Sequence, residues 1–130
     1  MNLLLDTHAW LWQLLQPECL SRRVQQMLNS SEHQLFLSPI SVWETLVLAE
    51  HGKLSLAPDP ITWVRAALSV SPTATAELSH DVAMKSRELP GLRHNDPADR
   101  FLIATAIVNE LTLVTADRRI RDYRKVQTLW

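Results

Sequence analysis

The chain is predicted to form an α/β fold in which a parallel sheet is covered by helices on both faces. Short apolar runs typical of buried strands alternate with helical patterns, and this alternation favours parallel strands joined by helices. The segment 96–110 is a predicted helix that is apolar nearly all round, so it should be buried on more than one side. A length of 130 residues suits a single domain, residues 1–130, with a real core.

The first half of the chain holds two predicted strands and three predicted helices. Residues 2–5 are a short apolar run that stops at the polar corner Asp6-Thr7, as expected of a buried strand that turns into a helix. Pro17 ends the first helix, and Gly52 ends the third helix, which Ser38-Pro39 begins. In chain order the predictions are a strand at 2–5, helices at 9–16 and 20–29, a strand at 34–37 and a helix at 38–51.

The second half continues the alternation. Asp59-Pro60 is a typical helix start, and Pro72 places the strand that contains it near an edge of the sheet. Asp96 is a good N-cap, Pro97 suits the first helical position, and Asp99 complements the helix dipole. In chain order the predictions are a helix from 59, a strand at 69–75, a helix from 76 or 77 to 88, a loop at 89–95, a helix at 96–110, a strand at 111–115, a short helix at 117–121 and a strand at 125–129.

Composition narrows the range of functions. The net charge of -1 argues against a protein that coats nucleic acid by bulk electrostatics, although a local basic patch remains compatible with it. The two glycines lie outside any phosphate-cradling pattern, which removes the nucleotide-loop folds. The single cysteine, Cys19, is expected in the core and fits a reducing compartment. The N-terminus does not resemble a secretory signal and no apolar run is long enough for a membrane helix, so we expect a cytoplasmic protein without membrane contact.

Five acids from four separate segments are predicted to converge at one edge of the sheet, because the carboxyl ends of parallel strands form the ligand crevice of such folds. They are Asp6, Glu44, Asp96, Asp99 and Asp117. Each has a structural explanation: Ser41 and Glu44 match a capping box, and Asp117 suits the N-cap of a short helix. Taken together they favour a divalent cation, because carboxylates a few ångströms apart raise one another's pKa and destabilise the fold unless an ion neutralises them.

The chemistry of the donors narrows the ion and the reaction. Oxygen ligands, without a Cys–His pair at zinc spacing, favour Mg²⁺ or Mn²⁺. Such an ion suits phosphodiester cleavage, because it can activate water and neutralise the charge that grows on the phosphate. The sequence leaves open whether one or two ions bind.

Four segments resemble the acid-bearing motifs of PIN-domain ribonucleases, and most of all the VapC-type toxins of bacterial toxin–antitoxin pairs. They are MNLLLDTHAWLW, SPISVWETLVLAEHGKL, HNDPADRFLIATA and LTLVTADRRI. The resemblance implies a three-layer α/β/α sandwich with about five parallel strands, endoribonuclease activity on RNA, an antitoxin partner and homodimers. It also implies that Asp6 and Asp99 are the principal metal ligands, that Glu44 and Asp117 complete the site, and that Asp96 accompanies them in a less settled role.

Other residues are assigned around this site. Arg100 and Arg118, the latter at the start of a basic run with Arg119, Arg121, Arg124 and Lys125, are expected to hold the RNA backbone. Thr115 is expected beside the substrate, bonded to a carboxylate or a metal-bound water. His8 and His94 are expected to pack or form hydrogen bonds rather than take part in catalysis. Trp43 is expected in the core, whereas Trp10 and Trp12 should face different sides of their helix.

Two alternatives come from other functional classes. A non-catalytic PIN-like module would bind RNA or a protein without cleaving it, but a dead site tolerates the loss of acids and this chain retains all of them. A phospho-acceptor signalling domain also places acids at the edge of a parallel sheet. That class calls for a lysine after a late strand, where this chain has arginines after Asp117.

Overall fold

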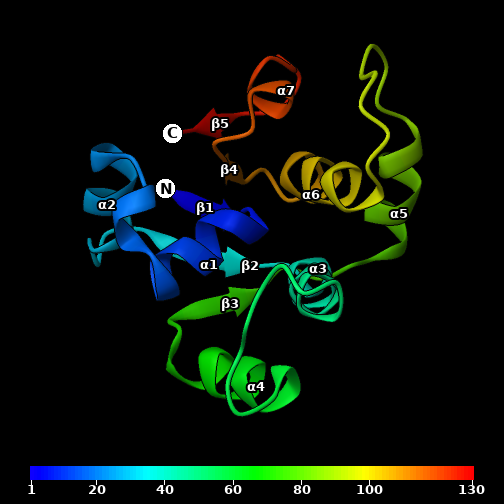
Figure 1. Cartoon of the computed structure of the whole chain (residues 1–130). Coiled ribbons are helices and arrows are strands. Elements are labelled where there is room, and N and C mark those ends of the chain that lie inside the picture. Colours follow the sequence, from blue (N-terminus) through cyan, green and yellow to red (C-terminus); the bar gives the residue numbers. More distant parts are fainter.

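The computed structural model of the chain describes residues 1–130 and contains one sheet of five parallel strands in the order β3-β2-β1-β4-β5 (Figure 1). β1 lies at the centre and pairs with β2 on one side and β4 on the other. The strands are β1 (Asn2–Leu5), β2 (Gln34–Leu37), β3 (Thr73–Thr75), β4 (Thr112–Val114) and β5 (Thr128–Leu129). The predicted α/β fold with a five-stranded parallel sheet is confirmed, and so is the edge position of the strand next to Pro72.

Helices connect the strands and begin at the residues that cap them. The side chains of Asp6, Ser38 and Asp96 each accept a hydrogen bond from a backbone N–H in the first turn of the helix that follows. The helices are α1 (Thr7–Leu15), α2 (Arg22–Leu28), α3 (Pro39–Glu50), α4 (Pro60–Val70), α5 (His80–Arg87), α6 (Pro97–Val108) and α7 (Arg118–Arg121), with a 3₁₀ turn at Pro17–Cys19. None of them has the length and apolar character needed to cross a bilayer.

The two faces of the sheet have separate cores, because successive side chains of a strand point to opposite faces. Leu3 and Leu5 of β1 pack with residues of α1, α2 and α4, including the fully buried Trp10. Leu4, between them, packs instead with residues of α6 and α7. Figure 1 shows α1 and α2 on one side of the sheet and α5 and α6 on the other. The α/β/α sandwich follows from this alternation.

α6 is the most buried of the helices. Seven of its twelve residues are buried, because it packs on the sheet with one side and against α5 with another. This confirms the prediction that an apolar stretch of this kind is covered on more than one side. Its burial fixes the position of its N-terminus, which carries Asp96 and Asp99.

Three predicted boundaries are wrong by three residues or more, whereas the others agree within two. Ser69 and Val70 belong to α4 rather than to the third strand, because the helix continues to Val70 and ends just before Pro72, which has no N–H to donate. α5 begins at His80 rather than at 76 or 77, because Ser79 caps it and the N–H of Ala76 still bonds to Leu37 of β2. The last strand is also shorter than predicted and comprises only Thr128–Leu129.

Two predicted core residues lie at the surface. Trp43 is 53% exposed, because α3 buries only Ser41 and Thr45 and the residue between them faces the opposite side. Cys19 is exposed at the end of the 3₁₀ turn. Both errors arise because local composition does not reveal which side of a helix the rest of the chain covers.

Candidate metal centre

The carboxyl edge of the sheet holds a pocket of about 470 Å³ that contains all five predicted acids. Parallel strands end there together, and α6 directs its N-terminus to the same edge, so segments far apart in sequence meet. The residues that line it are Asp6, His8, Trp12, Glu44, Asp96, Asp99, Ala116, Asp117 and Arg119. The predicted convergence is therefore present, with one cation, Arg119, at the rim.

Asp6 lies deepest and is fixed by two hydrogen bonds. It directly follows β1 and is 7% exposed. One oxygen accepts the N–H of His8 at 3.0 Å, and the other accepts the hydroxyl of Thr115, which follows β4. Burial raises the pKa of Asp6, and these hydrogen bonds oppose that shift. The carboxylate is thus oriented by the first turn of α1 and by the residue that follows β4.

Asp99 links two groups of potential metal ligands. It lies with Glu44 and Asp96 in one group and with His94 and Asp117 in another, and within each group the ligand atoms are within 4.8 Å of one another. Burial raises the pKa of Asp99, and Asp96 raises it further, whereas the hydrogen bond from His94 lowers it. Asp96 caps α6 by accepting the N–H of Asp99 at 3.0 Å.

Glu44, like Asp6 and Asp96, forms no ion pair with a cationic side chain. α3 begins at Pro39 and is capped by Ser38, so the predicted capping box of Ser41 and Glu44 is wrong and the carboxylate is not used by the helix. Burial raises the pKa of Glu44, and the negative charges of Asp99 and Asp6 raise it further. A half-buried glutamate in this setting favours a cation nearby.

Asp117 differs from the other acids because Arg119 neutralises it. The guanidinium of Arg119 donates to both carboxylate oxygens, at 3.3 and 3.0 Å, and its backbone N–H donates at 2.9 Å. These contacts hold the pKa of Asp117 below its ordinary value. Since the Arg119 side chain is 65% exposed, the pair lies at the open side of the pocket.

The three residues predicted to bind substrate do not line this pocket. Arg100 is 7% exposed, and its guanidinium donates to the carbonyls of Ser86 and His94 at 2.9 and 3.1 Å. Thr115 is fully buried and bonds to Asp6, which confirms its contact with a carboxylate but not a place beside substrate. Arg118 is exposed on α7 next to the pocket. The placement of Arg100 and Thr115 indicates structural roles in holding the site.

Arg119 is the charged pocket residue that the sequence does not single out, whereas His94 forms a hydrogen bond as expected. Arg119 was one member of a basic run, and only the turn of α7 shows that it, rather than Arg118, reaches the acids. His94 Nε2 lies 2.5 Å from an oxygen of Asp99. The five-residue spacing between His94 and Asp99 spans a helix cap, and no simple periodicity predicts contact across it.

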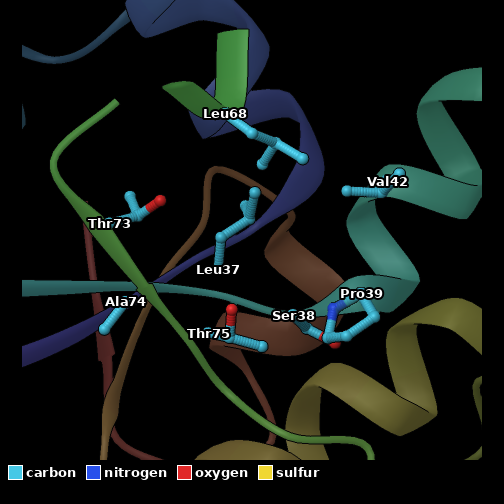
Figure 2. Close-up of a pocket in the computed structure, with 8 residues that line it drawn as sticks. All are labelled: Leu37, Ser38, Pro39, Val42, Leu68, Thr73, Ala74 and Thr75. Atoms are coloured by element: carbon cyan, nitrogen blue, oxygen red, sulfur yellow. The ribbon is translucent and has the colours of Figure 1, made fainter. Parts of the chain in front are cut away.

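A second hollow lies apart from the acids, between α3, α4 and β3, and has a volume of about 340 Å³. Figure 2 shows Leu68 of α4 and Val42 of α3 directed toward it from different sides, with Leu37 at the end of β2 below them. The other lining residues are Ser38, Pro39, Thr73, Ala74 and Thr75. Because none of these eight side chains titrates near neutral pH, this hollow offers no acid–base or metal chemistry.

Comparison with known proteins agrees with this architecture. The sequence profile of the PIN domain matches residues 3–126. The chain belongs to the PIN domain family. A curated member, Ribonuclease VapC22 of Mycobacterium tuberculosis, is 33% identical to this PIN domain over 131 aligned positions, which cover 99% of this chain and 98% of that protein.

Solved structures share the fold at lower identity. The DNA-bound VapBC complex of Salmonella typhimurium contains a chain with a TM-score of 0.74 and 17% identity, covering 99% of this PIN domain and 97% of that chain. A chain of VapBC2 from Rickettsia felis, bound to a promoter DNA fragment, has a TM-score of 0.73 and 15% identity. The match covers 99% of this PIN domain and 98% of that chain. A chain of FitAcB from Neisseria gonorrhoeae has a TM-score of 0.69 and 22% identity, and the match covers 98% of this PIN domain and 96% of that chain.

Replacement of Glu44 by Gln should stabilise the metal-free PIN domain at neutral pH and above. The raised pKa of Glu44 means that the folded state binds its proton more tightly than the unfolded state, so its contribution to stability falls as pH rises from the unfolded pKa through the folded one. Thermal melts in a chelator should show a higher Tm for Glu44→Gln at about pH 8, with the difference vanishing below about pH 4.

Glu50→Gln is the matched control, because Glu50 is exposed at the end of the same helix and should give no such gain. A Tm for Glu44→Gln equal to or below that of the unaltered protein at pH 8 would contradict the proposed charge repulsion.

Proposed function

We propose that this PIN domain is a metal-dependent endoribonuclease that hydrolyses RNA phosphodiester bonds and acts as the toxin of a toxin–antitoxin pair. The observation that carries the proposal is the convergence of five carboxylates from distant segments on one pocket. The ribonuclease name of the curated relative supports the activity, and the likeness to chains of VapBC complexes supports the partner.

The donor set fits a hard divalent ion. The five acids provide oxygen ligands, and two imidazoles lie beside them: His8 lines the pocket, and His94 is engaged with Asp99. Burial and mutual repulsion raise the pKa of Asp6, Glu44 and Asp99, a condition that a bound cation reverses. Small oxygen-rich sites of this kind suit Mg²⁺ or Mn²⁺, and we assign Mg²⁺ or Mn²⁺ as the cofactor.

The acids are proposed to bind the metal ion, and the arginines at the rim are proposed to bind the RNA backbone. Asp6 and Asp99 are the proposed principal ligands, with Glu44 and Asp117 completing the site directly or through water and Asp96 beside them. The ion, when bound, supplies an activated water and neutralises charge on the phosphate and the leaving oxygen. Arg119 and Arg118 at the rim are placed to attract the RNA backbone, Arg119 being the one that borders the pocket.

A groove on this PIN domain, next to the acids, suits the binding of the proposed antitoxin. A hollow of about 450 Å³ between α1 and the end of α3 shares His8 and Trp12 with the acidic pocket. Its other lining residues are Leu11, Leu15, Gln16, Leu48, Lys53 and Leu54. A segment with apolar anchors bound there would cover the mouth of the site.

Exposed apolar side chains on α3 and α4, among them Trp43 and Ile61, support the proposed homodimer.

The alternatives fit less well. A binding module without catalysis has no need to keep buried, mutually repelling acids such as Asp6 and Glu44, whose cost falls on the stability of the fold. A phospho-acceptor domain calls for a lysine in the acidic pocket, and the only cation that lines it is Arg119.

Replacement of Asp6 by Asn should abolish metal-dependent RNA cleavage. The change removes a buried negative ligand with little change in shape: the amide oxygen can still accept the N–H of His8, and the amide NH2 would face the hydroxyl of Thr115, which can accept. Cleavage of a single-stranded RNA in Mn²⁺ should fall by about 100-fold or more, and the rise in Tm that Mn²⁺ gives the unaltered protein should be lost.

Asp81→Asn, at an exposed acid in the first turn of α5, is the matched control and should behave as the unaltered protein. Equal RNA cleavage by the Asp6→Asn variant and the unaltered protein would contradict the nuclease assignment, and cleavage by neither would leave a binding module as the better account.

Replacement of Arg119 by Ala should weaken RNA binding through a lost phosphate contact. The affinity of a single-stranded RNA for the inactive Asp6→Asn protein should depend less on salt, with the slope of log K against log salt smaller in magnitude by about 0.7. Arg87→Ala, at an exposed residue that ends α5, should leave the slope unchanged. An unchanged slope for Arg119→Ala would exclude Arg119 from the RNA interface.

A further inference from the structure

His94 contacts a proposed metal ligand from a loop rather than from a helix or a strand. It lies in the loop between α5 and α6, and its Nε2 is 2.5 Å from Oδ2 of Asp99. The His94 and Asp99 side chains are only 11% and 14% exposed. Because Oδ2 of a carboxylate accepts, the tautomer assigned to His94 carries its proton on Nε2.

The backbone of this loop is held by side chains that lie outside the pocket. Arg100 donates from Nε to the carbonyl of Ser86 and from a terminal nitrogen to the carbonyl of His94, which ties the end of α5 to the loop. The hydroxyl of Tyr123 donates to the carbonyl of Pro90 at 3.0 Å. The imidazole of His94 is therefore brought to Asp99 by contacts with the main chain, which remain when the His94 side chain is changed.

Asp99 is the acid whose orientation matters most for the site, because it belongs to both groups of potential ligands. Its Oδ2 is engaged by His94, whereas its Oδ1 accepts no hydrogen bond from the protein. A carboxylate with one oxygen held by a donor has fewer orientations available, so its second oxygen is presented in a defined direction.

We propose that His94 is a positioning residue for the metal centre: its Nε2–H holds the Asp99 carboxylate so that the free oxygen faces the ion. Arg100 supports this role by anchoring the His94 carbonyl, which also explains why a buried arginine adjoins an acidic site without pairing with any carboxylate. The engagement of Nε2 with Asp99 favours this role over direct ligation of the ion by His94. The inference rests on the proposed metal-dependent function.

The test compares Mn²⁺ binding by the full chain and three variants, using calorimetry and the electron paramagnetic resonance of Mn²⁺. His94→Ala removes the donor, and we expect Mn²⁺ affinity to fall by about 10- to 100-fold. His94→Gln restores an N–H near the position of Nε2, so we expect it to recover most of that loss. His80→Ala, at an exposed histidine that begins α5, is the control and should bind as the unaltered protein does.

The outcomes distinguish the positioning role of His94 from direct ligation of the ion and from the absence of any role at the metal centre. A His94→Ala protein that binds Mn²⁺ as tightly as the unaltered chain would overturn the proposal. Failure of His94→Gln to recover affinity, or a ¹⁴N coupling to bound Mn²⁺ that His94→Ala abolishes, would overturn it in favour of direct ligation. Failure of the unaltered chain to bind Mn²⁺ would instead refute the metal-dependent function on which the proposal rests.

Discussion

The burial of carboxylates beside one another at the carboxyl edge of the sheet is the constraint on which the rest of the site depends. Asp6, Glu44 and Asp99 each have a raised pKa, with burial as the largest cause and neighbouring acids adding to it. The fold tolerates this because rigid elements fix the acids: β1 positions Asp6, and the buried α6 positions Asp99. A site that costs stability without its ion and gains it with the ion is well suited to binding a divalent cation tightly.

Helix N-termini offset part of the negative charge. Asp6 caps α1, Asp96 caps α6 and Asp117 caps α7, so three helices direct their positive ends toward the pocket. The capping role of these acids is compatible with the proposed metal-binding role, since each carboxylate accepts a capping hydrogen bond and also lines the pocket. Glu44 and Asp99 cap nothing, and they are the acids whose presence is least explained without an ion.

The parts of the site that follow from local sequence could be predicted, and those that depend on packing across the chain could not. The strand end at Asp6 and the helix start at Asp96 are visible as short patterns, and the parallel topology then brings the acids together. The burial of Arg100 depends on the end of α5 and on the loop at His94, neither of which periodicity places. Trp43 was misplaced for a similar reason, because which side of α3 is covered is decided by neighbours distant in sequence.

The most direct test of the account is anomalous diffraction from crystals of this protein grown or soaked with Mn²⁺. We expect a manganese peak inside the acidic pocket, within ligand distance of Asp99 and of at least one oxygen of Asp6, Glu44 or Asp117. Saturating Mn²⁺ that leaves the pocket without a peak, while the five acids keep the arrangement described above, would contradict the claim that their convergence serves a metal ion.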